Sequence, residues 1–506
     1  MKSKTLTFTY QTRFSCDENM SRILDTYAEL MSRVERRLFA DIAAGKSSSE
    51  LKSSYLIKFG ITARQFNALR VQLEGKIASL KELLPVRIEE ISSHIKNLEK
   101  KICKIKSKSA VHQKKRSLAS LKRKLSTLVA DQDKNKVRIC FGSKKLFRAQ
   151  FALEENGYTS HEQWLSIWRQ ERNDSFFCLG SKDETAGNQS CSATLQEDGS
   201  LLLRLRLPDS LNQGKYLEIP NITFSYGQET ILAALQSCKD RVSLTKQKDP
   251  NYIHHGQALS YRFKRDKKGW RVFVSTEQKE PKWITNKELG AIGVDINADH
   301  LAIVETDRFG NPIAHKSIPL VTYGKKSDQT LAIIGDAAAE IVEWSVRTKK
   351  TIVLEKLDFT AKKTELAESK APRYARMLSS FSYSSIIGNI KSRAYRFAIK
   401  VEEVNPAFTS VIGRVKFASR YGLTIHEAAA LAIARRFQET SERVPRRLDK
   451  IPDGKCGHVT LPLPARNQGK HVWSQWREIR KNLPVAPAAH FRAKKIDPLG
   501  RRKSAH

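Results

Sequence analysis

The sequence predicts a multidomain α+β protein, because the character of the chain changes twice along its length. The first part combines one strand-like segment with amphipathic helices, and the middle part alternates in short strand-like runs. The last part orders strands and helices around a single predicted sheet. With 506 residues, the chain is long enough for roughly three domains of about 100–200 residues each. Apolar residues make up 40% of it, which is enough to form cores.

The net charge indicates the class of partner. Lys and Arg number 90 against 53 Asp and Glu, so the formal net charge is +37. Such an excess favours a polyanion, and we expect nucleic acid. No apolar run reaches the roughly 18 residues of a membrane span, and we expect neither a membrane partner nor a signal peptide. The seven cysteines occur singly, without a CxxC motif, which favours a reducing compartment over a disulfide framework.

The first part of the chain is expected to begin with a strand and continue as helices. Residues 1–20 hold the alternating segment TLTFTYQTRF, and residues 21–136 follow with helical periodicity. Apolar residues recur at steps of three and four over 88–105 and again over 118–128. This predicts two antiparallel helices joined by a basic turn at 106–116.

The predicted helical hairpin is strongly basic. Residues 100–136 hold 13 Lys or Arg against two Asp. One interpretation is an ordinary helix pair with solvated lysines; the other, which the lopsided ratio favours, is a basic arm along a phosphate backbone. The candidate contacts are Lys114, Lys115, Arg116, Lys122, Arg123 and Lys124.

A small β-barrel is expected over residues 137–285. Asp198–Gly199 separates two strand-like runs within 192–207, which is typical of a hairpin, and 259–275 repeats the pattern. The leading segment FGSKKLFRAQ combines a glycine turn with Lys144, Lys145 and Arg148. These three are candidate phosphate contacts, although any short basic turn has this composition.

The order of elements becomes informative after residue 286. The predicted elements are strands at 291–297, 300–306 and 312–318, a helix at 327–347, a strand at 351–354, a helix at 384–398, a strand at 400–404 and a helix from 424. This is the element order of a ribonuclease H-like fold, which we expect over 286–436 with a basic lid loop at about 360–381.

In that architecture the first and fourth strands are neighbours, so Asp295 and Glu355 would project from adjacent strand ends. A third acid on the final helix, Glu427, would reach the same point. Three converging carboxylates repel one another unless divalent cations lie among them. Two-metal phosphodiester cleavage needs this arrangement, with ions roughly 3.5–4 Å apart. Oxygen ligands favour two Mg²⁺ or Mn²⁺ ions over zinc.

Other interpretations of these residues stay open. Asp295 taken alone could start a turn, Glu355 could end a strand in solvent, and Glu427 could be an exposed helix acid. His426 competes with Glu427 for the third position, as a ligand or a general base. Asp299 and Asp358 are near enough to be considered as ligands and rank below these residues.

Three segments resemble a known family. GVDINADHLAIVETDRFGNPI, IVLEKLDF and VEEVNPAFTSVIGRVKFASRYGLTIHEAAALAIARR are similar to the three RuvC motifs of TnpB-related proteins. These are transposon-associated RNA-guided nucleases related to miniature type V CRISPR effectors. FGSKKLFRAQ and SYRFKRDKKGWRVFV also resemble this group, so the likeness covers most of residues 137–436.

The resemblance implies a bilobed, monomeric effector in the cytoplasm of a bacterium or archaeon, associated with the nucleoid through DNA. A wedge barrel and a helical recognition lobe would hold a guide RNA and its heteroduplex with double-stranded target DNA, next to a short adjacent DNA motif. The first two motif acids correspond to Asp295 and Glu355. The paired CxxC motifs and the third-motif Asp of typical members are absent, and Cys456 with His458 is too little for zinc.

These features give two main hypotheses, an RNA-guided DNA endonuclease and a guided DNA-binding repressor whose nuclease is inactive. Intact Asp295 and Glu355 favour the endonuclease. A transposase ranks third, because a helical hairpin and a barrel precede the nuclease region instead of a helix-turn-helix.

The basic tail over residues 437–506 carries 16 Lys or Arg against six Asp or Glu. Within it, HVWSQWREIRKNL is expected to be helical. Trp473 and Trp476, with Arg477 and Arg480, suit stacking on unpaired bases. Alternatively, the tryptophans anchor the tail against the nuclease core.

Overall fold

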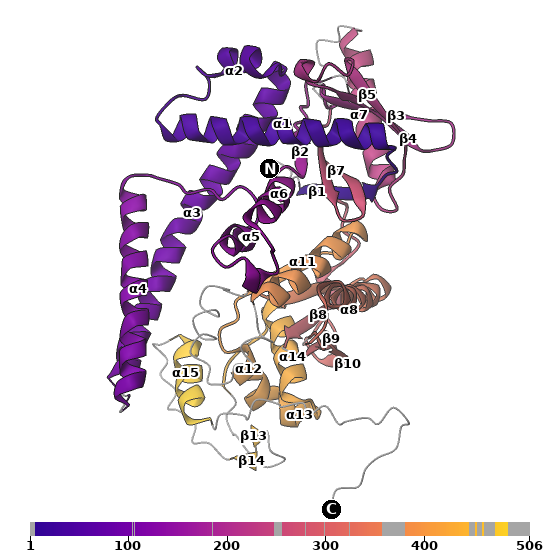
Figure 1. Ribbon diagram of the computed structural model, residues 1–506. Coiled ribbons are helices and arrows are strands. Elements are labelled where there is room, and N and C mark those ends of the chain that lie inside the picture. The colour runs from indigo at the N-terminus through magenta and orange to yellow at the C-terminus, as the bar shows by residue number, and fades with distance from the viewer. Residues whose placement is uncertain are drawn as a thin grey trace, which may run out of the picture. The chain divides into compact units, whose positions relative to one another are not determined.

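The protein is described by a computed structural model, shown in Figure 1. It describes residues 6–103, 105, 107–184, 186–246, 256–278, 280–297, 299–322, 324–356, 380–444, 451–452, 458–459 and 471–483. The chain mixes helices with several sheets and divides into two compact units, Met1–Glu280 and Pro281–His506. In the described part, no helix is long and apolar enough to cross a membrane.

Capping side chains begin most helices of the first unit. These helices are α1 (Glu18–Ala43), α2 (Lys52–Phe59), α3 (Ala63–Ile102), α4 (Lys108–Asp133), α5 (Lys144–Ala149), α6 (His161–Arg172) and α7 (Gln228–Lys246). Asp17, Ser107 and Ser160 each accept a hydrogen bond from a backbone N–H of the first turn. Thr62 and Gln65 form a reciprocal capping box at the start of α3. Short polar residues therefore set the helix starts.

The strands of the first unit form two separate antiparallel sheets. One has the order β1 (Leu6–Arg13), β7 (Gly269–Gln278), β6 (Leu259–Asp266) and β2 (Ser175–Cys178). The other has the order β3 (Cys191–Leu195), β4 (Leu201–Arg206) and β5 (Tyr216–Ile222). Both predicted hairpins are confirmed, as β3–β4 and β6–β7.

The prediction of a small β-barrel over 137–285 is wrong. Among the described strands, no ladder joins the two sheets, so they do not close into a barrel. Between β2 and β3, the side chain of Asn188 takes the place of a ladder. It donates to the carbonyls of Cys178 and Leu259 at 3.0 and 2.8 Å. Backbone acceptors at the sheet edge are thus satisfied by a side chain. The alternating pattern predicts strands, but it does not determine which edges pair.

Helices and sheets of the first unit share one core. Tyr27 of α1, Phe66 of α3 and Phe263 of β6 are fully buried within it. Tyr27 stacks on Phe176 of β2, with the ring centroids 4.1 Å apart. The core therefore joins the region expected to be a helical lobe with the region expected to be a barrel.

The predicted pair of helices is confirmed as α3 and α4, which lie antiparallel side by side (Figure 1). The basic turn predicted at 106–116 is wrong, because α4 already begins at Lys108. Buried Ile91, Ile95 and Leu98 form the inner face of α3. Lys122 of α4 reaches Glu99 of α3 at 2.8 Å. The remaining face of α4 is exposed.

The second unit is built on a five-stranded sheet with the order β10 (Pro312–Pro319), β9 (His300–Thr306), β8 (Ala291–Ile296), β11 (Thr351–Glu355) and β12 (Val401–Val404). β8, β9 and β10 are antiparallel, and β11 lies parallel to both β8 and β12. The helices are α8 (Ser327–Thr348), α11 (Ser380–Arg396), α12 (Thr409–Ile412), a π-helix at Gly413–Ala418, α13 (Ser419–Tyr421), α14 (Ile425–Phe437) and α15 (Val472–Asn482). The order and directions are those of the ribonuclease H-like fold expected from the sequence.

Alternation along β8 assigns its side chains to the two faces of this sheet. Ile292 and Val294 pack in the same cluster as residues of α8 and α11. Ala291 packs with Ile433 and Ala434 of α14. Asp295 is an even number of residues from Ala291, so it lies on the α14 face.

Small residues bring α14 close to the sheet. A Cβ atom at Gly293 would lie 2.0 Å from the carbonyl oxygen of Ala430 and 2.9 Å from the backbone nitrogen of Ala434. On the opposite side, a Cβ at Gly413 would meet the carbonyl of Ala428 at 2.5 Å. The helix is thus held between two glycines, neither of which leaves room for a side chain.

We expect Gly293→Ala to destabilise the second unit because the added methyl group meets helix backbone. The loss should reach the upper end of the roughly 1–3 kcal/mol typical of overpacked cores. Faster amide hydrogen exchange in the peptides of β8 and α14 measures it.

The matched control is Gly335→Ala in α8, where a Cβ has nothing within 4 Å. Since alanine favours a helix over glycine by about 1 kcal/mol, this change should stabilise the protein. Equal effects of the two substitutions would contradict the close approach of α14.

Candidate active site

Asp295 and Glu355 lie at the carboxyl ends of two adjacent parallel strands. The β8–β11 ladder pairs Thr351 with Ala291 and Val353 with Gly293. Two residues further in the same register, Glu355 stands opposite Asp295. Ligands of open α/β sheets bind at such strand ends. The predicted adjacency of these two strands is confirmed, and both acids lie on the α14 face.

Asp295 is 7% exposed and is held by one side-chain amide and one imidazole. Its Oδ2 accepts from Nδ2 of Asn297 at 2.9 Å and lies 3.2 Å from Nδ1 of His426. The ring of His300 meets that of His426 edge-on, with centroids 4.8 Å apart. Because two side chains hold Oδ2, the direction of the carboxylate is fixed.

Glu355 is oriented from another element. Its Oε1 accepts a hydrogen bond from the hydroxyl of Thr409, which is 1% exposed at the start of α12. Thr409 lies in the NPAFTS part of the third motif. We did not single it out from the sequence, and neither did we single out Asn297, which ends GVDIN, or His300. Their positions within the motif segments are the only signal for them.

Glu427 points away from this pair of acids. Its Oε2 accepts from the backbone N–H and the hydroxyl of Thr424 at 3.0 and 2.8 Å, closing a capping box at the start of α14. Its Oε1 lies 2.8 Å from Nδ1 of His315 on β10. Burial opposes ionisation of Glu427, but the hydrogen bonds from His315 and Thr424 outweigh it and lower its pKa.

The structure therefore brings His426, and not Glu427, next to Asp295. Adjacent residues on a helix are separated by about 100°, so only one of the two can face β8. Among the described residues, no group of three His, Cys, Asp or Glu side chains is arranged to hold a metal ion. Asp299 pairs with its neighbour His300 at 2.7 Å. Asp358 and residues 360–379 of the predicted lid loop lie outside the described residues, and residues 380–381 belong to α11.

Comparison with protein-family models gives no match, and no curated protein matches the sequence. Solved structures do match. RuvC of T. thermophilus in complex with Holliday junction substrate is 14% identical with a TM-score of 0.22, over 30% of this chain and 91% of that one. The Cas12f1–sgRNA–target DNA complex is 11% identical with a TM-score of 0.32, over 85% of this chain and 99% of that one.

The Cas12i1 R-loop complex before target DNA cleavage is also similar, at 9% identity and a TM-score of 0.15, over 80% of this chain and 45% of that one. The structural neighbours thus include RuvC and Cas12 proteins. Likenesses this distant do not assign an activity, so the function rests on the side chains of the chain itself.

The predicted phosphate contacts on α4 and α5 are on the surface. Lys114, Lys115, Arg116, Lys122, Arg123, Lys124, Lys144, Lys145 and Arg148 are all exposed. The basic clusters at 114–116 and 122–124 lie slightly more than two helical turns apart on α4, which is about 12 Å along the axis. The surface of α4 can therefore present positive charge along a polyanion, and the contacts themselves stay predictions.

The tail helix α15 decides between the two interpretations of its tryptophans. Trp476 is fully buried in the cluster that contains Leu431 of α14, and its indole N–H donates to the carbonyl of Glu442 at 2.8 Å. The prediction that Trp476 stacks on bases is therefore wrong. The alternative, that this side chain anchors the tail against the nuclease core, is confirmed. Trp473 is half-buried and donates to the Glu442 carboxylate at 3.0 Å.

The other residues singled out in the tail are two arginines and the CxH pair. Arg477 and Arg480 are exposed and stay predicted contacts. Cys456 lies outside the described residues, and the side chain of His458 is not described, although its backbone pairs in the short ladder of β13 (Ile451–Pro452) with β14 (His458–Val459).

The positions of His426 and Glu427 predict different outcomes for their substitution. His426→Ala should abolish any cleavage without lowering stability. Glu427→Ala should lower the free energy of unfolding by roughly 1–3 kcal/mol, because the hydrogen-bond donors on Thr424 and His315 lose their acceptor. Glu427→Gln keeps an acceptor oxygen and should restore most stability and cleavage. Thermal unfolding and a DNA cleavage assay on the same preparations measure both effects.

A stable but inactive Glu427→Gln protein would contradict this assignment. It would show that the charge of Glu427 is needed, as expected for the third metal ligand predicted from the sequence.

Proposed function

We propose that this protein is an RNA-guided DNA endonuclease that cleaves by a divalent-cation-dependent, RuvC-like mechanism. The observation that carries the proposal is the pair Asp295 and Glu355 at the ends of adjacent parallel strands, on the face that α14 covers. Both sit in motifs that resemble those of TnpB-related nucleases. A ribonuclease H-like sheet with this pair of acids suits phosphodiester hydrolysis.

The chemistry of the donor set suits Mg²⁺ or Mn²⁺. Asp295 and Glu355 offer carboxylate oxygens, which these hard cations prefer. They would hold two ions together with a third group, which we place at His426 in preference to Glu427. When bound, the ions would supply an activated water and stabilise the charge that develops on the phosphate.

The other side chains orient the two acids. Asn297 and His426 fix Oδ2 of Asp295, and Thr409 fixes Oε1 of Glu355. Outer hydrogen bonds of this kind commonly set the direction and basicity of metal-ligating groups. The site therefore needs little rearrangement of its acids when it binds substrate.

The partners that we propose are a guide RNA and double-stranded target DNA, including their heteroduplex, bound by one copy of the chain. The net charge of +37 and the exposed basic face of α4 support a polyanion. RNA guidance rests on the motif resemblance. The cytoplasm of a bacterium or archaeon, with association to the nucleoid through DNA, follows as the proposed location.

A second candidate function is guided binding of DNA without cleavage. The observation that favours it is the missing third acid, since Glu427 is engaged by Thr424 and His315. Both candidates require a bound RNA, so sequencing of RNA that co-purifies with the protein tests what they share. Cleavage separates them.

Asp295→Ala and Glu355→Ala should each abolish cleavage of target DNA in Mg²⁺ and leave guided binding nearly unchanged. The acids hold cations and do not contact the duplex, so binding is spared. Cleavage gels and filter binding, with and without EDTA, measure the two activities.

Asp328→Ala is the matched control, because Asp328 is an exposed acid in the first turn of α8. It should cleave normally. Undiminished cleavage by the Asp295 and Glu355 variants would exclude this site, and a native protein that binds its target without cutting would favour the binding-only candidate.

If α4 follows a phosphate backbone, replacing Lys114 and Lys115 with Gln should weaken RNA binding and flatten its salt dependence. The slope of log K against log salt should fall by roughly 0.7–0.9 for each phosphate that the variant no longer neutralises. Replacing Lys267 and Lys268, which are exposed in the β6–β7 turn, removes the same charge elsewhere. If the slope of log K against log salt is the same for both double variants, the lysines of α4 are ordinary solvated side chains and the phosphate-contact interpretation is wrong.

A further inference from the structure

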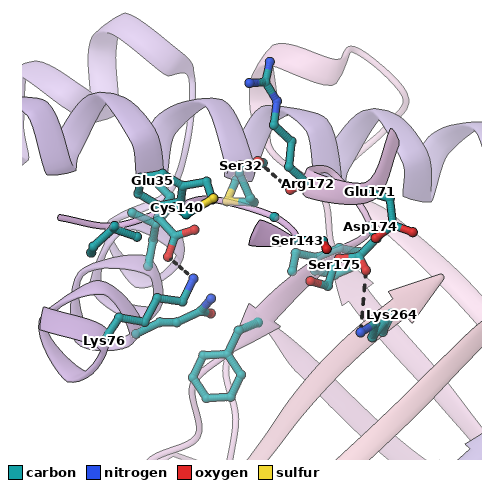
Figure 2. Close-up of a pocket in the computed structure, with 18 residues that line it drawn as sticks. Ser32, Glu35, Lys76, Cys140, Ser143, Glu171, Arg172, Asp174, Ser175 and Lys264 are labelled. Atoms are coloured by element: carbon teal, nitrogen blue, oxygen red, sulfur yellow. Dashed lines mark hydrogen bonds and ion pairs between the residues drawn. The ribbon is translucent and has the colours of Figure 1, made fainter. Parts of the chain in front are cut away.

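The first unit contains a cavity of about 410 Å³ that none of the proposed chemistry uses. It lies among α1, α3, the end of α6 and strand β2 (Figure 2). Its volume is within the roughly 300–1,000 Å³ typical of small-molecule sites. One wall is residues 139–143, which include the start of the FGSKKLFRAQ segment. A motif that stood out in the sequence therefore borders the cavity.

The inner surface of the cavity is partly apolar. Met31 of α1, Leu69 of α3 and Phe176 of β2 line it and are 8%, 6% and 3% exposed. Phe141 adds an aromatic ring, with Nζ of Lys76 5.9 Å from its centroid. An apolar floor with an aromatic side chain suits a flat ring system.

Ion pairs stand on opposite sides of this floor. Nζ of Lys76 lies 2.6 Å from Oε1 of Glu35, and Nζ of Lys264 lies 3.6 Å from Oδ2 of Asp174 (Figure 2). Glu171, which is exposed at the end of α6, also lines the cavity and forms no ion pair within the described part of the chain.

The formal charges of the lining residues cancel. Three are acidic (Glu35, Glu171 and Asp174) and three are basic (Lys76, Arg172 and Lys264). A phosphate site collects cations without carboxylates, so the cavity does not suit a phosphate. It suits a neutral, planar molecule with separate donor and acceptor edges.

We infer that the cavity binds one unpaired guanine base of a nucleic acid strand. Guanine presents two adjacent donors, N1–H and the 2-amino group, on one edge, and two adjacent acceptors, O6 and N7, on another. Glu171 accepts from the first edge, and Lys76 on the opposite wall donates to the second. The base lies on the apolar floor, as extruded bases do between apolar and aromatic side chains.

The surroundings of the cavity suit the strand that carries the base. Ser143 lines the cavity, and the exposed Lys144 and Lys145 follow it directly in the chain. They hold the phosphates on either side of the bound guanosine. Phosphate contacts supply affinity here, and the cavity supplies base selectivity. The inference depends on the proposed function only for the class of partner, because binding of the base needs no metal and no cleavage.

The test measures binding of fluorescein-labelled UUGUUU, UUAUUU and UUUUUU to the full-length protein in EDTA. The native protein should bind UUGUUU roughly 5- to 150-fold more tightly than the other two, the discrimination that a good bidentate base contact gives. The same three sequences as deoxyribonucleotides identify the strand. A preference confined to the RNA series supports the site and assigns it to the guide, and one confined to the DNA series supports it and assigns it to the target.

Two variants locate the preference. Glu171→Gln should reduce it at least about 5-fold while binding of UUUUUU is unchanged, and Gln72→Trp should abolish it by filling the cavity from α3. Glu162→Gln, an exposed acid on the same helix that does not line the cavity, is the control and should bind as the native protein does.

Equal binding of UUGUUU and UUUUUU by the native protein would overturn the inference, and so would a guanine preference that survives Glu171→Gln. If thermal melting shows that Gln72→Trp does not fold, Glu171→Gln alone decides. Loss of cleavage in Asp295→Ala has no bearing on these measurements, so failure of the nuclease proposal and failure of this one are distinguishable.

Discussion

The approach of α14 to β8 is the contact on which the position of the candidate site depends. The helix lies directly against Gly293 on one side and Gly413 on the other, at distances that exclude any side chain. Its first turn is thereby brought to the end of β8, where Nδ1 of His426 lies 3.2 Å from Asp295. A displacement of α14 by about 1 Å would exceed what a hydrogen bond of this length tolerates.

A buried ion pair fixes the strand that carries the second acid. Nζ of Lys350 lies 2.6 Å from Glu305 on β9 and donates to the carbonyl of Thr306 at 2.8 Å, while the indole of Trp344 on α8 donates to the same carboxylate. Burying these charges is costly, and removal of one partner leaves the other uncompensated. Because β11 begins directly after Lys350, the pair holds its register against β8. Glu355 stays opposite Asp295 for this reason.

The order of the predicted elements was sufficient to predict the ribonuclease H-like sheet and the adjacency of Asp295 and Glu355. The sequence pattern did not determine which side chain at the start of α14 faces β8. Thr424 and Glu427 do have the spacing of a capping box, and this could have been recognised. Pairing between sheet edges is equally invisible in an alternating pattern, so two sheets were mistaken for a barrel. The burial of Trp476 depends on the surface that α14 offers, which composition does not describe.

The distribution of charge separates affinity from selectivity in this chain. Exposed lysines such as those of α4 attract any phosphate backbone, and a net charge of +37 makes that attraction strong and independent of sequence. Selectivity therefore requires places where this excess of positive charge is absent. Two such places are the cavity, where carboxylates balance lysines, and the sheet edge, where Asp295 and Glu355 exclude phosphate unless cations accompany it. Under the proposed function, a nucleic acid attracted by the exposed lysines would be recognised at the neutral cavity and cut at the acidic sheet edge.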